Sequence, residues 1–156
     1  MHCHINYEIR RLVSKTPRRD GPGFFYIFVK NSIIMITARH FKESEFKACT
    51  PSCSMQDMNQ GTITRLDMVR DLAGIPLVLN SAYRSKEWEK KQGRTGKSAH
   101  CEGRAADIRC NSSQNRWKIV KAAIQAGFTR IGIGKTYIHL DDSYTHESEV
   151  IWHYYK

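Results

Sequence analysis

Residues 98–107 are the part of this chain best suited to chemistry. They read Ser-Ala-His-Cys-Glu-Gly-Arg-Ala-Ala-Asp and set His100 and Asp107 seven residues apart. A second histidine, His139, follows in the run Thr-Tyr-Ile-His-Leu-Asp. Two imidazoles and one carboxylate form a ligand set that suits Zn²⁺ and leaves a fourth position open for water. Because an open position is typical of catalytic zinc, the pattern predicts a zinc-dependent hydrolase.

Two strands and a turn are expected to position these ligands. Residues 105–108 read as a strand that carries the aspartate, and Gly103 permits a tight turn before it. Residues 135–140 read as a second strand that carries the later histidine. Side chains alternate between the two faces of a strand, so this histidine is expected to share its face with Tyr137 and Asp141.

Hydrophobic periodicity predicts further helices and strands along the chain. A short helix or turn is expected over residues 41–46, helices over 62–73, 86–92 and 114–126, and strands over 76–79, 129–133 and 150–155. The residues of the two longer helices expected to face inward are Ile63, Leu66, Val69 and Leu72 in the first and Trp117, Val120 and Ile124 in the second. This mixture predicts an α+β fold with a central, mostly antiparallel sheet and flanking helices.

The chain is long enough for one domain with a substantial core, and it is strongly basic. It has 156 residues and a net charge of +10. Such a charge suits nucleic acid, an anionic membrane or an acidic polymer such as a bacterial cell wall. The sequence shows no RNP-type aromatic strand, zinc-finger spacing or basic heptad helix, so a specific nucleic-acid partner is not expected.

Residues 1–37 differ from the rest and are expected to form an N-terminal extension to a domain of residues 38–156. Their apolar run of roughly 15 residues is shorter than the ~20 that a membrane span needs, so no transmembrane segment is expected. Three interpretations stay open: an added strand or hairpin, an atypical export or anchor signal, or translated upstream sequence with the true start at Met35. We favour the last, or an ill-ordered extension.

The cysteines and the N-terminal histidines carry less information. Five cysteines at low density favour free thiols and a reducing compartment. Cys49 and Cys53 are spaced for a disulfide or a metal pair, but no second pair completes a four-cysteine site. His2, Cys3 and His4 lie at the chain end, where adventitious metal binding is the expected behaviour.

The ligand pattern resembles the M15 family of zinc peptidases, the D-alanyl-D-alanine carboxypeptidase group, which shares its fold with the Hedgehog signalling domain. The matching segments are Ser-Ala-His at 98–100, Gly-Arg-Ala-Ala-Asp at 103–107, Ile-His-Leu-Asp at 138–141 and Ser-Ala-Tyr-Arg-Ser at 81–85. Residues 41–46, the Cys49–Cys53 loop and residues 152–155 resemble the subgroup found in phages and prophages. The resemblance covers about residues 38–156.

This resemblance implies roles for individual residues and a substrate. It makes His100, Asp107 and His139 the ligands of Zn²⁺, and it matches Arg84 to the arginine that faces the substrate carbonyl or carboxylate. A guanidinium there would stabilise negative charge that develops on oxygen. The implied reaction is hydrolysis of peptidoglycan stem peptides or other D-amino-acid peptides, by a carboxypeptidase or an endolysin-like endopeptidase. We expect a monomer that acts at the bacterial cell wall, with its export route left open.

The general base is the weakest part of the pattern. Members of the group carry Glu or Asp three positions before the last ligand, or His two positions before it. Here these positions hold Thr136 and Tyr137. Neither is a good base at neutral pH. Asp141 is the first candidate, unless it orients the ligand histidine instead. Glu149 and His153 are alternates, and Glu102 is expected to be solvated. The missing base keeps a second function open, that of a catalytically impaired zinc-containing module that binds the cell wall.

Overall fold

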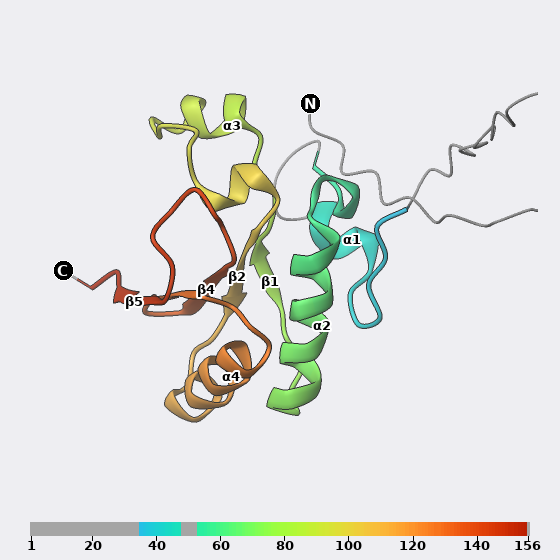
Figure 1. Cartoon of the computed structure of the whole chain (residues 1–156), viewed down its shortest axis with the longest axis vertical. Helices are drawn as coiled ribbons and strands as arrows, with labels where there is room; N and C mark the ends of the chain where they lie inside the picture. The colour runs from blue at the N-terminus through green and yellow to red at the C-terminus, as the bar shows by residue number, and fades with distance from the viewer. Residues whose placement is uncertain (1–34, 48–52, 156) are drawn as a thin grey trace, which may run out of the picture. The chain divides into compact units, whose positions relative to one another are not determined.

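The computed structural model describes residues 35–47 and 53–155 (Figure 1). Residues 36–156 form one compact unit. The interpretations of the N-terminal extension, the His2-Cys3-His4 cluster and the Cys49–Cys53 pair depend on residues outside these ranges. They stay predictions, as does the domain boundary at residue 38.

A five-stranded sheet forms the centre of the unit and confirms the predicted α+β class. Its strands are β1 (Leu79–Ser81), β2 (Ala105–Arg109), β3 (Arg130–Ile133), β4 (Tyr137–Asp141) and β5 (Val150–His153). The spatial order is β1-β2-β4-β3-β5. The first four strands pair antiparallel in this order, and β5 pairs parallel to β3. The sheet is therefore mostly antiparallel, as predicted.

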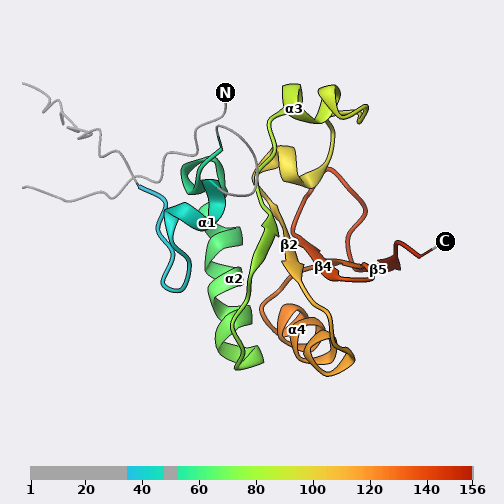
Figure 2. The ribbon, with the colours of Figure 1, turned by 180° about the vertical axis from the view of Figure 1, so that it is seen from behind.

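The helices lie around this sheet. They are α1 (Glu43–Lys47), α2 (Gln60–Ala73), α3 (Lys86–Lys91) and α4 (Ser113–Gln125), with short 3₁₀ turns η1 (Met55–Asp57) and η2 (Ala99–Glu102). Asn59 caps the start of α2 by accepting hydrogen bonds from two backbone amides, and Ser112 caps α4 in the same way with one. In both views α2 runs beside β1, while α3 and α4 lie at opposite ends of the sheet (Figures 1 and 2).

The two faces of the sheet have different characters. Ile138 and Leu140 of β4 point into the hydrophobic core, together with Ile108 of β2 and Ile131 of β3. The core also includes Ile63, Leu66 and Val69 from α2 and Ile119, Ala122 and Ala123 from α4. Because strand side chains alternate, His139 and the other odd-numbered residues of β4 lie on the opposite face. That face carries the polar site.

Three residues expected in the core are exposed instead. Leu72 of α2 is 51% exposed, and Trp117 and Ile124 of α4 are 70% and 56% exposed. A spacing of three residues drifts by about 60° per step around a helix, so nine residues after Ile63 the chain has turned to the opposite side. On α4 the buried positions are held by Ile119 and by the small Ala122 and Ala123, and the two alanines allow the helix backbone to approach its neighbours closely.

Candidate metal centre

A single row of side chains crosses the polar face of the sheet. Asp107 of β2 is the register partner of His139 of β4, which pairs in turn with Gly132 of β3. The row continues to Ser81 of β1 at one end and Trp152 of β5 at the other. Residues directly opposite each other on neighbouring strands share a face, so pairing brings two of the three predicted ligands together.

The third predicted ligand, His100, comes from the 3₁₀ turn η2. Its ring is buried, and its Nδ1 lies 2.6 Å from the carbonyl oxygen of Ala82. A carbonyl oxygen only accepts hydrogen bonds, so Nδ1 carries the proton in the neutral ring. The lone pair on Nε2 is then available to a metal.

Gly103 ends this turn and explains why a glycine follows the histidine. Its φ of +69° is in the left-handed region that favours glycine. A Cβ atom at this position would lie only 2.4 Å from the carbonyl oxygen of Asp57. The turn that presents His100 therefore packs directly on η1, and only glycine fits there.

The three donor atoms form a compact triangle. His100 Nε2 lies 3.2 Å from His139 Nδ1, which lies 2.8 Å from Asp107 Oδ1. The remaining side, from His100 Nε2 to Asp107 Oδ1, is 3.4 Å. Zinc–ligand bonds of about 2.0–2.1 Å in a tetrahedral site place the ligand atoms about 3.3 Å apart. The buried His100–Asp107–His139 group can therefore hold a metal ion.

The orientation of His139 also fits a metal ligand. Its Nε2 lies 2.8 Å from Asp141 Oδ2, so in the neutral ring Nε2 carries the proton and Nδ1 presents its lone pair to the triangle. Asp141 is buried, and both of its oxygens lie within 3.1 Å of Arg130 Nε. The sequence left two roles open for Asp141, that of general base and that of a residue that orients His139. Its position behind the imidazole favours the orienting role.

Burial and hydrogen bonding set the protonation of the cluster. Burial lowers the pKa of His100 below its ordinary value, which keeps this ring neutral. Burial alone would raise the pKa of Asp107, but the neighbouring imidazoles of His100 and His139 hold it well below its usual range. Burial opposes charge on His139 as well, yet Asp107 and Asp141 raise the pKa of that imidazole. The cluster thus favours positive charge between His139 and Asp107, where a cation would lie.

Arg84 lies beside the cluster, but its guanidinium is largely engaged. Its Nη2 donates to Asp107 Oδ2 over 2.6 Å, and its Nε donates to Ser81 Oγ over 2.8 Å. Its Nη1 lies 3.4 Å from the buried carboxylate of Glu89, which also accepts a hydrogen bond from Ser98. Arg84 therefore fixes the second oxygen of the predicted ligand Asp107, while its edge still lines the open site.

The cluster opens into a hollow of about 420 Å³. Its lining includes the three predicted ligands, Arg84, Arg94 and Arg130, and the aromatic residues Tyr137, Trp152 and Tyr154. Two glycines make room for this aromatic wall, because a Cβ at Gly132 or Gly134 would lie within 3 Å of these rings. The hollow thus combines a candidate metal, positive charge and apolar surface.

The structure places the other acid–base candidates from the sequence, Glu149, His153 and Glu102, outside the lining of the metal-centre hollow. Glu149 and His153 are exposed, and neither is among the described residues that line the hollow. Glu102 accepts hydrogen bonds from Ser143 and Thr145 and keeps 22% of its side chain exposed, so it is solvated only in part. The reason is that the loop after β4 folds back over η2.

The same loop brings His146 to the hollow, and no spacing in the sequence indicated this residue.

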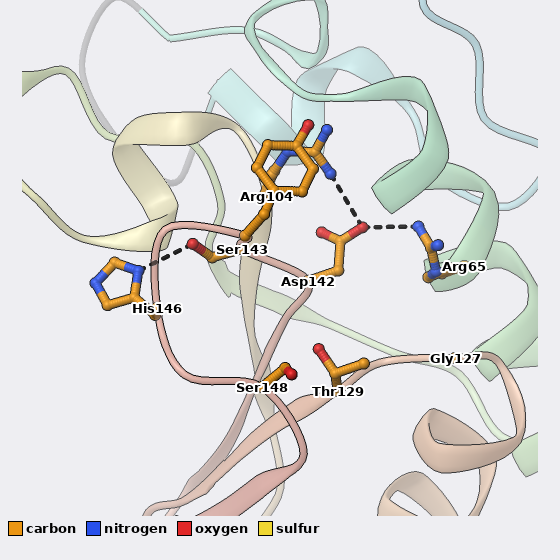
Figure 3. A pocket seen from close by; sticks show the side chains of 9 residues that line it. Arg65, Arg104, Gly127, Thr129, Asp142, Ser143, His146 and Ser148 are labelled. Atoms are coloured by element: carbon orange, nitrogen blue, oxygen red, sulfur yellow. Dashed lines mark hydrogen bonds and ion pairs between the residues drawn. The ribbon is translucent and has the colours of Figure 1, made fainter.

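A second hollow, of about 360 Å³, lies on the other side of this loop (Figure 3). In it the buried Asp142 carboxylate accepts hydrogen bonds from Thr62 Oγ1 and Arg65 Nη1, each over 2.7 Å. Arg104 Nη1 lies 3.4 Å from the same carboxylate. These contacts join α2 to the strands and contain no candidate metal cluster among the described residues.

The fold and the site together define a candidate metal-dependent hydrolase. Residues 39–141, more than half of the chain, match the Peptidase M15 family, and the chain belongs to this family. The matched region includes all three candidate ligands and Arg84, and the five-stranded sheet with flanking helices is consistent with an M15 peptidase fold. Peptidases of this family are typically zinc-dependent. A search of curated proteins found no match to this chain.

The resemblance predicted from the sequence is thereby confirmed at the level of the family. Within the described residues, no helix is long and apolar enough to cross a membrane.

Proposed function

We propose that the protein is a zinc metallopeptidase that hydrolyses peptide bonds in peptidoglycan stem peptides at the bacterial cell wall, as in the phage and prophage subgroup. The observation that carries this proposal is the triangle of His100 Nε2, Asp107 Oδ1 and His139 Nδ1, with sides of 2.8–3.4 Å. Both imidazoles are held in the tautomer that a metal needs. A ligand set of this kind, at the base of an open hollow, suits catalysis better than a closed structural site.

Zinc bound by these three residues would polarise the scissile carbonyl and lower the pKa of a water molecule. The chain's own residues would do the rest. Asp141 holds Nε2 of His139 and so keeps the ligand's Nδ1 directed at the site. Arg84 holds Asp107 through one nitrogen, and its edge in the hollow stabilises negative charge on the carbonyl oxygen or a substrate carboxylate.

The charges in the hollow support an acidic peptide as substrate. Three arginines line it, whereas its two lining carboxylates among the described residues, Asp107 and Asp141, are both bonded to histidine and arginine. Stem peptides of peptidoglycan carry free carboxylates, which such a site would attract. The aromatic wall offers apolar surface to the small aliphatic side chains of the same peptides.

The test is mass spectrometry of muropeptides after digestion of purified peptidoglycan, with and without a chelator. We expect new peptide termini with the zinc-loaded protein and none after chelation or in the His100→Ala variant. His153→Ala is the matched control, because this histidine is exposed and outside the hollow. Zinc-dependent binding to peptidoglycan without cleavage would contradict the proposal and support a catalytically impaired wall-binding module instead.

A further inference from the structure

His146 is the histidine of the metal-centre hollow that belongs to neither the ligand triangle nor its direct contacts. It lies in the loop between β4 and β5 and is half-buried, with 35% of its side chain exposed. Figure 3 shows its ring on the side of the loop away from Asp142 and Arg65, with Nδ1 directed at Ser143. His146 is among the residues that line the hollow of the three candidate ligands, and it also lines the second hollow, around Asp142.

The other acid–base groups of this hollow are already engaged. Among the described residues that line it, the carboxylates are Asp107, in the triangle, and Asp141, which His139 and Arg130 occupy. The arginines stay charged at all ordinary pH values, and the tyrosine hydroxyls are poor bases near neutrality. An imidazole has its ordinary pKa close to neutral pH, which suits it to take and return a proton.

Hydrogen bonds fix which nitrogen of His146 carries the proton. Nδ1 lies 2.9 Å from Ser143 Oγ and 3.1 Å from Thr145 Oγ1. Both hydroxyls have the Glu102 carboxylate as a partner, Ser143 Oγ over 2.9 Å and Thr145 Oγ1 over 2.5 Å. A carboxylate accepts only, so both hydroxyl protons go to Glu102. Nδ1 must then be the donor to the hydroxyl oxygens, and Nε2 of the neutral ring keeps its lone pair.

The same loop is attached to the metal centre. The backbone N–H of Ser143 donates to Asp141 Oδ1 over 3.1 Å, and Asp141 in turn holds His139. Ser143 thus contacts both Asp141, which holds the candidate ligand His139, and the ring of His146. In the general pattern, a carboxylate holds a catalytic imidazole in the tautomer of a base through a hydrogen bond. Here the half-buried Glu102 acts on His146 through the hydroxyls of Ser143 and Thr145.

We propose that His146 is the general base and acid of this site, with Ser143 and Glu102 as positioning residues. The inference rests on the proposed peptidase function. A water molecule that attacks the scissile carbonyl carbon gives one proton to Nε2 of His146, and the carbonyl π electrons move onto oxygen. When the C–N bond breaks, the imidazolium returns this proton to the departing nitrogen. The products are a carboxylic acid and an amine, and the ring is neutral again.

The first test compares His146→Gln and His146→Ala with the zinc-loaded full chain in muropeptide hydrolysis. We expect kcat to fall by about 10²-fold or more with KM and zinc content unchanged, because positioned acid–base groups contribute about 10²–10⁴-fold. Added imidazole should restore part of the activity of His146→Ala, which a structural role would not allow. The control is His153→Gln, which replaces an exposed histidine outside the hollow.

The second test does not depend on turnover. Nitrogen-15 NMR of the histidine rings should show His146 in the Nδ1–H form, and Ser143→Ala should mix the two tautomers and lower kcat by about tenfold. An Nε2–H form in the wild type, or full kcat in His146→Gln, would overturn the proposed role of His146 but leave the proposed peptidase function standing. A wild-type protein that binds zinc but cleaves no peptide bond would overturn the proposed function as well.

Discussion

Asp141 and Asp142 are adjacent in the chain, and both are buried and paired with arginine, yet they belong to different parts of the molecule. Asp141 contacts Arg130 and the imidazole of His139 on the polar face of the sheet. Asp142 contacts Arg65, Arg104 and the hydroxyl of Thr62 in α2. Asp141 and its partners support a candidate metal ligand, whereas Asp142 and its partners join a helix to the sheet.

The difference shows that an ion pair does not indicate function by itself. A buried carboxylate with arginine partners is equally consistent with a structural tie and with support of a metal site. What separates the two is the third partner, which is an imidazole that faces two other ligands in one case and a threonine hydroxyl in the other. Variants of Asp141 should therefore change the affinity for zinc, and variants of Asp142 should change the free energy of unfolding.

The largest effect is expected from the ligand itself. His139→Ala removes one of the three donor atoms, so bound zinc should fall from about one ion per chain to none, and hydrolysis should disappear. Metal analysis after gel filtration measures this. Retention of bound zinc by the variant would place the metal elsewhere, and circular dichroism of the variant would exclude unfolding as the cause of a loss.

A loss of stability without loss of zinc is expected for Asp142→Ala. The variant leaves Arg104 without its carboxylate partner at a site where only 11% of that side chain is exposed, which should lower the free energy of unfolding by about 3 kcal/mol. Urea denaturation measures the change, with the exposed Glu149→Gln as a control. A stable variant that cannot bind zinc would remove the distinction between the two aspartates.

An intermediate effect on zinc affinity is expected for Asp141→Asn. Residues that orient metal ligands typically contribute 10–100-fold to metal affinity, or about 1.4–2.7 kcal/mol. Competition with a chromogenic chelator measures the dissociation constant directly. If the affinity were unchanged and only kcat fell, Asp141 would be the base that the sequence suggested first.

The smallest effect is expected at the edge of the structural cluster. Arg65→Ala removes a partner of Asp142 whose side chain is 36% exposed, so solvent screening limits the loss to about 1 kcal/mol. Thermal unfolding with and without zinc measures it, and the zinc-dependent shift should match that of the wild type. A larger loss than in Asp142→Ala would show that Arg65 has a role beyond this pair.

The sequence predicted the candidate metal site better than its surroundings. His100, Asp107 and His139 lie in strongly patterned segments, and strand alternation alone placed Asp141 on the face of His139. Arg130, Glu89 and His146 contact the site from a neighbouring strand, a helix and a loop, so their roles depend on tertiary packing that no local pattern contains. Helix faces were least predictable in α4, where two of the buried positions are the small Ala122 and Ala123 while the large Trp117 faces solvent.

The most direct test of the metal site is X-ray absorption at the zinc edge of the zinc-loaded protein. We predict a first shell of nitrogen and oxygen atoms at about 2.0–2.1 Å, with outer-shell scattering from two imidazole rings. A sulfur shell at about 2.3 Å would mean that a cysteine binds the metal, and it would contradict the ligand set of His100, Asp107 and His139.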